Sequence, residues 1–366
     1  MSRDADAQSS IRLYGLIDAA VTYASNTQGP HTLSENSGDV TGSHWGIAGT
    51  EDIGSGTAAV FALESGFSVT NGTSRQGGRL FGFQSYAGLS NAEYGAIMLG
   101  RQYDPVVDYV APLSFTGHHP GGNNLSAHPY DNDNDNNTFR VDNAIKFASS
   151  NYDGLTFGTL YGFSNEAGGF DDNRVYSAAA SYDAGGLVVA AGFLQANNGG
   201  SANTDGAITL TDRTFVASQQ RIYAAGVNYL PGRATYGFVW SRTQLGGLDT
   251  INSSNGLGLV QNGQGASFDN FEVNASYSFS KAFRLNGEYT FTQGALSTAS
   301  GEHKPRWNEV SVQTDYYLSN NTDVYAQVSY QHIQADGSGL RADITAQTPS
   351  STDSQTVAAL GLRHRF

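Results

Sequence analysis

Polar and apolar residues alternate with a period of two along most of this chain, up to its last residue. The clearest stretch runs from 271 to 279, where one face carries Phe271, Val273, Ala275, Tyr277 and Phe279. The same alternation recurs in the segments 283–292, 309–315 and 324–331. Successive side chains of a β-strand point to opposite faces, whereas an amphipathic helix repeats every 3.6 residues. The pattern therefore predicts an all-β chain whose strands have one apolar and one wet face.

Turn residues divide this pattern into many strands. We expect seven tight turns, at Glu51-Asp52, Asn91-Ala92, Asn151-Tyr152, Asp183-Ala184, Pro231-Gly232, Ser280-Lys281 and Asn320-Asn321. Eight longer loops rich in Gly, Asn, Asp and Ser are expected near 26–42, 70–78, 104–137, 164–173, 196–220, 244–268, 294–306 and 335–353. These fifteen connections join about sixteen strands, with short connections at one end and long ones at the other. Such an arrangement is typical of a transmembrane antiparallel β-barrel.

Composition narrows the choice of function. The 366 residues include no Cys, which excludes disulfides and thiolate chemistry, and the formal net charge is −14. An acidic chain with scattered Lys and Arg disfavours nucleic acid as a partner. No apolar run reaches the 18 residues of a membrane-spanning helix, but a barrel strand needs an apolar residue only at every second position.

A soluble β-sandwich would show the same alternation. It has no reason to separate short from long connections, or to place aromatic residues such as Tyr277, Phe279 and Phe283 near strand ends, where a barrel forms interfacial girdles. A secreted β-rich binding or adhesion protein is the less favoured alternative, suggested by the high Asn, Ser and Gly content and the missing apolar signal core. Residues 1–8 are interpreted as an N-terminal processing remnant or extension.

Several segments carry a family resemblance, and they lie near both ends and in the first third of the chain. They are Ser9 to Asp18, Ser43 to Gly54 continuing to Leu63 to Phe67, Tyr86 to Ser90, Leu99 to Asp104, and Gly361 to Phe366. These segments resemble the Gram-negative trimeric general porins, particularly those of β-proteobacteria; the region from about 165 to 270 matches mainly in strand pattern.

The resemblance implies one sixteen-stranded outer-membrane barrel over residues 9–366, with short periplasmic turns and long extracellular loops. It implies a homotrimer surrounded by outer-membrane lipid and lipopolysaccharide, in which small hydrophilic solutes diffuse passively through a water-filled channel. A C-terminal aromatic such as Phe366 resembles the signal that the outer-membrane assembly machinery reads. A closing strand that pairs with the first strand would also explain that ending.

The resemblance further implies that the third long loop, 104–137, folds inward and narrows the pore. In this family the loop supplies acids, here Asp104 and Asp108, opposite a ladder of inward arginines. Arg140 matches one rung, and Lys146 lies on the same predicted strand face, opposite Val141.

This chain departs from the ladder at two rungs, where His44 and Phe83 stand in place of arginine. The loss of two fixed positive charges argues against simple transfer of the family's usual anion preference. Phe83 either packs beneath the loop or provides a stacking surface for a flat solute. The alternative function is therefore a substrate-preferring channel for an organic acid or aromatic compound on the same barrel.

The acidic run at Asp131, Asp133 and Asp135 is a weak candidate for a Ca²⁺ or Mg²⁺ site. Its spacing partly fits an EF-hand loop, but Asn136 stands where that loop needs Gly, and a solvated acidic loop explains the run equally well. No catalytic or cofactor motif has the required spacing, so we expect no enzymatic activity and no required cofactor. Inward carboxylates such as Glu272, Glu288 and Glu309 are explained by a water-filled lumen.

Overall fold

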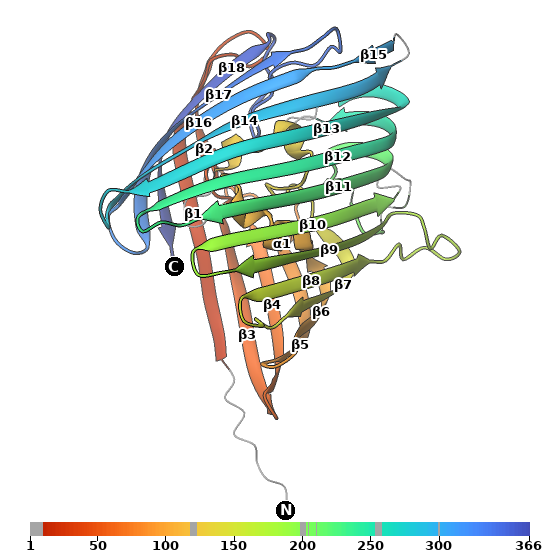
Figure 1. Ribbon diagram of the computed structural model, residues 1–366, viewed down its shortest axis with the longest axis vertical. Coiled ribbons are helices and arrows are strands. Elements are labelled where there is room, and N and C mark those ends of the chain that lie inside the picture. The colour runs from red at the N-terminus through yellow and green to blue at the C-terminus, as the bar shows by residue number, and fades with distance from the viewer. Residues whose placement is uncertain are drawn as a thin grey trace, which may run out of the picture.

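The computed structural model describes residues 10–117, 123–197, 203, 205–209, 211–252, 258–298 and 301–366. Within them the chain forms a closed antiparallel barrel of sixteen strands, which confirms the predicted fold class (Figure 1). The sheet closes because β1 pairs with β18 on one side and with β3 on the other. The barrel strands are β1 (Ser10–Ala24), β3 (His44–Gly54), β4 (Thr57–Gly66), β5 (Gln84–Asn91), β6 (Gly95–Gln102), β7 (Val141–Ser149), β8 (Leu155–Gly162), β9 (Arg174–Asp183), β10 (Leu187–Asn197), β11 (Phe215–Tyr229), β12 (Ala234–Asn252), β13 (Gly258–Ser278), β14 (Phe283–Thr298), β16 (Arg306–Tyr317), β17 (Thr322–Gln334) and β18 (Ser354–Arg365).

Two further strands extend the sheet inside long loops. β2 (Thr32–Ser37) pairs with β1, and β15 (Gly301–His303) pairs with β14. The predicted N-terminal segment 1–8 lies outside the described residues. No helix in the described part of the chain is long and apolar enough to cross a membrane.

The strands follow the period-two pattern. On β13, Val273 and Tyr277 are exposed on the outer face, whereas Glu272 is buried on the inner face. Tyr277 packs against Phe279 at 4.8 Å, and Phe279 against Phe283 at 5.5 Å, beside the β13–β14 turn. This cluster lies at a strand end, where the sequence predicted part of an aromatic girdle.

All seven tight turns are present, although the β3–β4 turn lies at Ser55 and Gly56, several residues after the predicted Glu51-Asp52. Two predicted loops are wrong. Most of 244–268 and part of 294–306 are strand, because β12, β13 and β14 continue their pairing far beyond the turn-rich composition that suggested loops. Similarly, β11 begins at Phe215, inside the predicted loop 196–220.

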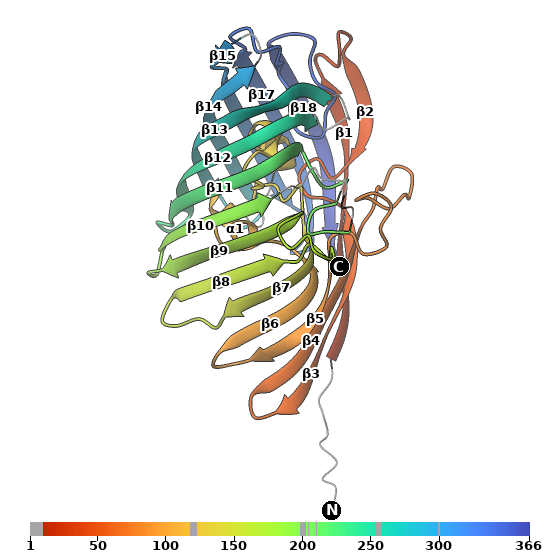
Figure 2. The same cartoon turned by 90° about the vertical axis from the view of Figure 1, so that its right-hand side faces the viewer.

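The third long loop folds into the barrel, as predicted (Figures 1 and 2). It contains α1 (Pro105–Tyr109) and three short 3₁₀ turns, η1 (Ala111–Leu113), η2 (Asn124–Ser126) and η3 (Pro129–Asp131). α1 lies against β8, β9 and β10, η1 contacts β11 and β12, and η2 reaches β16 on the opposite wall. The loop thus crosses the lumen.

The inner wall under this loop is apolar rather than wet. Val106, Val110 and Leu113 of the loop pack against inward residues of β7 to β12, among them Leu160, Val175, Leu194, Ile222 and Val239. Burying such side chains contributes about 1.5–3 kcal/mol each. The expectation of a uniformly polar inner face is therefore wrong on this side, because the loop and the wall share a hydrophobic core.

Candidate channel constriction

Asp104 fixes the start of the third loop. It is the N-cap of α1, where its carboxylate accepts hydrogen bonds from the Val106 N–H at 2.8 Å and from Asn134 Nδ2 at 2.8 Å. Burial raises the pKa of Asp104 to about 6, against those two hydrogen bonds, which lower it. Because Asp104 is fully buried, it has no surface facing the lumen.

Lys146 on β7 holds α1 to the wall. Its ammonium forms an ion pair with Asp108 and donates to the Tyr103 carbonyl at 3.0 Å. Burial raises the pKa of Asp108, and Lys146 opposes that shift. Lys146 is buried, whereas the Asp108 side chain remains 28% exposed. Of this pair, only Asp108 offers a polar surface to the lumen.

His44 and Phe83, which stand where the family has arginines, lie in one cluster with Arg140. The Arg140 guanidinium carbon lies 4.5 Å from the centre of the Phe83 ring and 5.2 Å from that of Tyr103. The His44 ring lies 5.7 Å from the Phe83 ring. This cation–π contact and the hydrogen bond from Arg140 Nη2 to Asn137 Oδ1 at 2.8 Å fix the guanidinium in place.

Phe83 has no open face for a solute. It is 7% exposed, lies between His44 and Arg140, and fits where Gly42 and Gly66 lack side chains. A Cβ at Gly66 would come within 2.5 Å of the ring. Of the two interpretations of Phe83 drawn from the sequence, stacking of a flat solute disagrees with this geometry, because the ring packs against His44, Arg140 and Gly66.

A backbone irregularity changes the predicted faces of β7. Asn143 has a φ of +51°, and the register with β6 shifts at Gly100 and Gln102. As a result Val141, predicted to face lipid, is buried in the interior cluster. Asp142 instead pairs with Arg101 at 2.5 Å.

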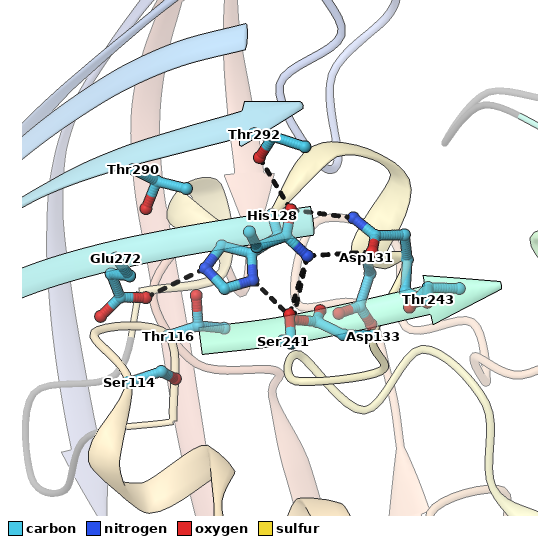
Figure 3. Close-up of polar contacts among 12 residues, drawn as sticks. Ser114, Thr116, His128, Asp131, Asp133, Ser241, Thr243, Glu272, Thr290 and Thr292 are labelled. Carbon is cyan, nitrogen blue, oxygen red and sulfur yellow. Dashed lines mark hydrogen bonds and ion pairs between the residues drawn. The ribbon is translucent and has the colours of Figure 1, made fainter. Parts of the chain in front are cut away.

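His128 joins the third loop to the far wall (Figure 3). Its Nδ1 lies 2.6 Å from Asp133 Oδ2 and its Nε2 lies 3.2 Å from Glu272 Oε2 on β13. Burial acts to lower the pKa of His128, but Asp133 and Glu272 outweigh it and raise that pKa well above 6.5. Ser241 and Asn270 also donate to Asp133, so the network connects the loop with β12 and β13.

The acidic run does not converge on one point. Asp131 accepts the N–H groups of Asn136 and Thr138 at 2.8 and 2.9 Å, whereas Asp133 faces His128. Burial and the nearby Asp133 raise the pKa of Asp135 well above its usual value. Among the described residues, no group of three or more His, Asp or Glu side chains is placed to hold a metal ion. The Asp131–Asp133–Asp135 hypothesis thus has no geometric support.

The inner faces of β1, β4 and β5 carry residues that the sequence pattern did not single out. The Tyr14 hydroxyl donates to Glu64 Oε2 at 2.8 Å, and the Arg12 guanidinium lies 5.3 Å from the Tyr14 ring. Tyr14 and Tyr86 remain partly exposed, whereas inner residues in the middle of β13, β14, β16 and β17 are buried, among them Glu272, Thr290, Gln313 and Gln331. Strand parity alone assigns Tyr14, Glu64 and Tyr86 to the inner face, so the alternation could have found them.

An open pocket of about 400 Å³ lies between the loop that follows β4, the residue Thr138 before β7, and the segment that precedes β11. Its lining includes Arg75, Gln76, Thr138, Thr211 and Asp212. The lining mixes charges of both signs. It forms a polar vestibule next to Arg140.

The fold and the inserted loop define a class of protein, the outer-membrane channel barrel. The family model described as Gram-negative porin matches residues 3–336. An outer membrane porin protein of Bordetella pertussis is 29% identical, with 99% of this chain and 96% of that protein covered. The anion-selective porin from Comamonas acidovorans superposes with a TM-score of 0.75 at 19% identity, covering 98% and 100% of the two chains. The trimer form of OmpT from Vibrio cholerae superposes with a TM-score of 0.66 at 15% identity, covering 98% and 99%.

This chain belongs to the Gram-negative porin family. It is an outer-membrane porin that forms a channel for the passive diffusion of small solutes. The resemblance drawn from the sequence is confirmed, as is the prediction that the chain is not an enzyme. A secreted adhesion protein is excluded by the same findings.

Proposed function

We propose that solutes pass between the third loop and the inner faces of β1, β4 and β5. The observation that carries this proposal is the distribution of exposure inside the barrel. Tyr14, Tyr86, Tyr103 and Asp108 keep surface toward the lumen, whereas the opposite inner wall is covered by the loop. On this basis His44 and Arg140 border the eyelet, and Lys146 and Asp104 act by holding the loop.

We propose that this eyelet is only weakly ion-selective. The ammonium of Lys146 is neutralised by Asp108, and Arg140, 5% exposed, is covered by two rings. Glu64, itself 7% exposed, and the exposed Arg12 beside Tyr14 add one charge of each sign on the wall. Among the described residues the eyelet therefore has little excess of exposed positive charge, in contrast to an arginine ladder. The Comamonas porin is described as anion-selective, but at 19% identity the likeness supports the fold alone.

The reversal potential in a planar bilayer under a KCl gradient tests this proposal. We expect a small reversal potential, and conductance in steps of three if the channel inserts as a trimer. A large anion-selective reversal potential would contradict the assignment of charges at the eyelet. Impermeability of properly inserted protein would contradict the proposed path itself.

As a second candidate function, we propose a channel that prefers organic acids over other small solutes. The observation in its favour is the polar vestibule, where Arg75 and Thr138 border an open pocket of about 400 Å³. This preference is measured by adding small mono- and dicarboxylates and recording how far each reduces the ion current through the channel. Equal, weak effects of all acids at the same ionic strength would leave general diffusion as the function.

We propose that the chain assembles as a homotrimer, as OmpT of Vibrio cholerae does in its trimer form. The loop between β4 and β5 projects away from the barrel wall on the side of β1, where it could reach a neighbouring barrel (Figure 2). Leu80 in this loop is exposed. Analytical ultracentrifugation in detergent should give three chains per particle, and a monomer that conducts would contradict the proposal.

Outer-membrane lipid, lipopolysaccharide and the assembly machinery are proposed partners. The terminal Phe366 pairs its backbone with Gly15 of β1 and keeps an exposed ring. Removing the Phe366 side chain should slow assembly in vivo more than refolding in detergent.

Divalent bridging between acidic loops and lipopolysaccharide predicts that excess EDTA lowers the melting temperature of the purified trimer, and an unchanged melting temperature would refute it.

A further inference from the structure

The inner face of β14 and β16 carries two buried glutamates on neighbouring cross-strand pairs, and the buried Asn286 lies one inward position further along β14. In the register of these strands Asn286 is paired with Gln313, Glu288 with Ser311, and Thr290 with Glu309. Glu288 and Glu309 are therefore diagonal neighbours on one face, at a separation that long side chains bridge. Their residues are 6% and 2% exposed, and Asn286 is 2% exposed.

Each of the two glutamates has one oxygen bound and one without a hydrogen-bond donor. Thr290 Oγ1 donates to Glu288 Oε2 at 2.8 Å, and Gln331 Nε2 donates to Glu309 Oε2 at 2.8 Å. The other oxygens, Glu288 Oε1 and Glu309 Oε1, are buried and receive no hydrogen bond from the described residues. An unsatisfied buried carboxylate oxygen is costly, so its environment requires an explanation.

Asn286 carries a further oxygen of the same kind. Its amide nitrogen donates to Asp315 Oδ2 at 2.7 Å, which fixes the orientation of the amide. A flipped amide would place Oδ1 against that carboxylate. Asn286 Oδ1 thus points away from Asp315, is buried, and has no donor in the described part of the chain. Beside it, the Ser311 hydroxyl donates to Ser329 Oγ at 2.8 Å and keeps its lone pairs available.

No cationic side chain compensates the two glutamates. Across the described ranges, neither Glu288 nor Glu309 forms an ion pair with Lys or Arg. The positive charge that acts on both glutamates is that of His128, whose two ring nitrogens are already bound to Asp133 and Glu272. Glu272 itself is saturated, because it also accepts from the Phe115 N–H and Asn274 Nδ2. Two buried carboxylates without a partner require a counter-charge or protons.

We infer that Glu288 and Glu309, with the Ser311 hydroxyl, bind a hard cation on the inner wall, for which Ca²⁺ is the best match. All the groups offered are oxygens, and two of them are anionic. Ca²⁺ accepts six to eight oxygen ligands in flexible geometry and completes its shell with water. The site uses two carboxylates, so it does not conflict with the absence of three-acid groups among the described residues. It is separate from the acidic run of the third loop.

The test is Ca²⁺ binding to the purified, chelator-treated protein in detergent, followed by calorimetric titration and thermal unfolding. We expect one saturable site per chain and a rise in melting temperature with Ca²⁺. Glu288→Gln/Glu309→Gln should lose both. The matched control Glu51→Gln/Asp52→Asn removes the same charge from the exposed end of β3 and should retain both. Retention of the site in the first variant would overturn the inference.

A second measurement needs no variant. Trp307 is buried on β16 two residues before Glu309, on the same face of the strand, so Tb³⁺ in the site should luminesce on tryptophan excitation and be displaced by Ca²⁺. Absence of this signal would overturn the inference. An infrared band of protonated carboxylic acid at neutral pH and saturating Ca²⁺ would also overturn the inference, if that band disappears in the double variant. It would show that the glutamates hold protons instead of a cation. Binding in solution is independent of ion selectivity, so the two proposals fail separately.

Discussion

Lys146 and Asp108 form an ion pair that joins the third loop to the barrel wall, and the two partners differ in their access to water. The Lys146 side chain is 8% exposed, whereas that of Asp108 is 28% exposed. Loss of either partner breaks the same contact but leaves a different residue behind. The two substitutions should therefore have unequal effects.

Asp108→Asn leaves a buried ammonium without a counter-charge, which typically costs about 3–5 kcal/mol. Lys146→Met leaves a carboxylate that can turn to the lumen and hydrate, so a smaller loss is expected. Thermal unfolding should rank the proteins as wild type, Lys146→Met, then Asp108→Asn. The double variant Asp108→Asn/Lys146→Met should recover part of the loss. Equal melting temperatures of the two single variants would contradict this account, and a looser loop should increase open-channel noise in both.

Phe83 provides a prediction for ion selectivity. Phe83→Arg places a second guanidinium beside Arg140 and should shift the reversal potential toward anions. Phe83→Gln is the matched control, because it removes the ring without adding charge and should leave the reversal potential unchanged. The lost cation–π contact costs about 0.5–2 kcal/mol, which thermal unfolding measures in both variants. A shift of equal size in both variants would mean that the ring itself, and not the charge, sets selectivity.

The fold was predictable because its signal is local and repeated. Strand parity placed Val273 outward and Glu272 inward, and turn residues gave the number of strands. The loop between β12 and β13 was mispredicted, because composition cannot indicate how far two strands continue to pair beyond the membrane.

The constriction was only partly predictable. His44, Phe83 and Arg140 were expected near one another, and they are in contact. The buried role of Asp104 depends on Asn134, thirty residues away, and Val141 turns inward because of the positive φ at Asn143. Such contacts depend on the path of the loop, which no periodicity encodes.

The His128 network predicts a loss of stability at alkaline pH. The folded-state pKa of His128 is raised above 6.5, so its stabilising effect is complete below 6.5 and is lost as pH rises through the folded-state value. A tenfold difference in proton affinity between the folded and unfolded states corresponds to about 1.36 kcal/mol. His128→Gln should be less stable than wild type at neutral pH and should lose this pH dependence. His31→Gln, in an exposed loop, is the control and should behave as wild type. A melting temperature of wild type that stays constant into the alkaline range would refute the assignment.

Asp343, in the loop between β17 and β18, predicts a pH dependence of the same direction from a different cause. Burial raises its pKa to about 7, and its Oδ1 receives no hydrogen bond from the described residues. A raised carboxyl pKa means that the folded state holds the proton more tightly. Stability is therefore highest below the unfolded value of 3.8 and falls as pH rises through about 7, by at most about 4 kcal/mol.

Asp343→Asn keeps the shape of the side chain and removes the titration. It should raise the melting temperature at pH values above 7, leave it nearly unchanged below 4, and retain the hydrogen bond from its N–H to Gln331 Oε1 at 2.7 Å. Asp353→Asn, an exposed carboxyl in the same loop, is the control and should change little. Destabilisation of the barrel by Asp343→Asn at every pH would contradict this prediction. It would mean that the charged carboxylate has a partner, so that an ion pair or a bound cation holds the loop instead of a buried neutral acid.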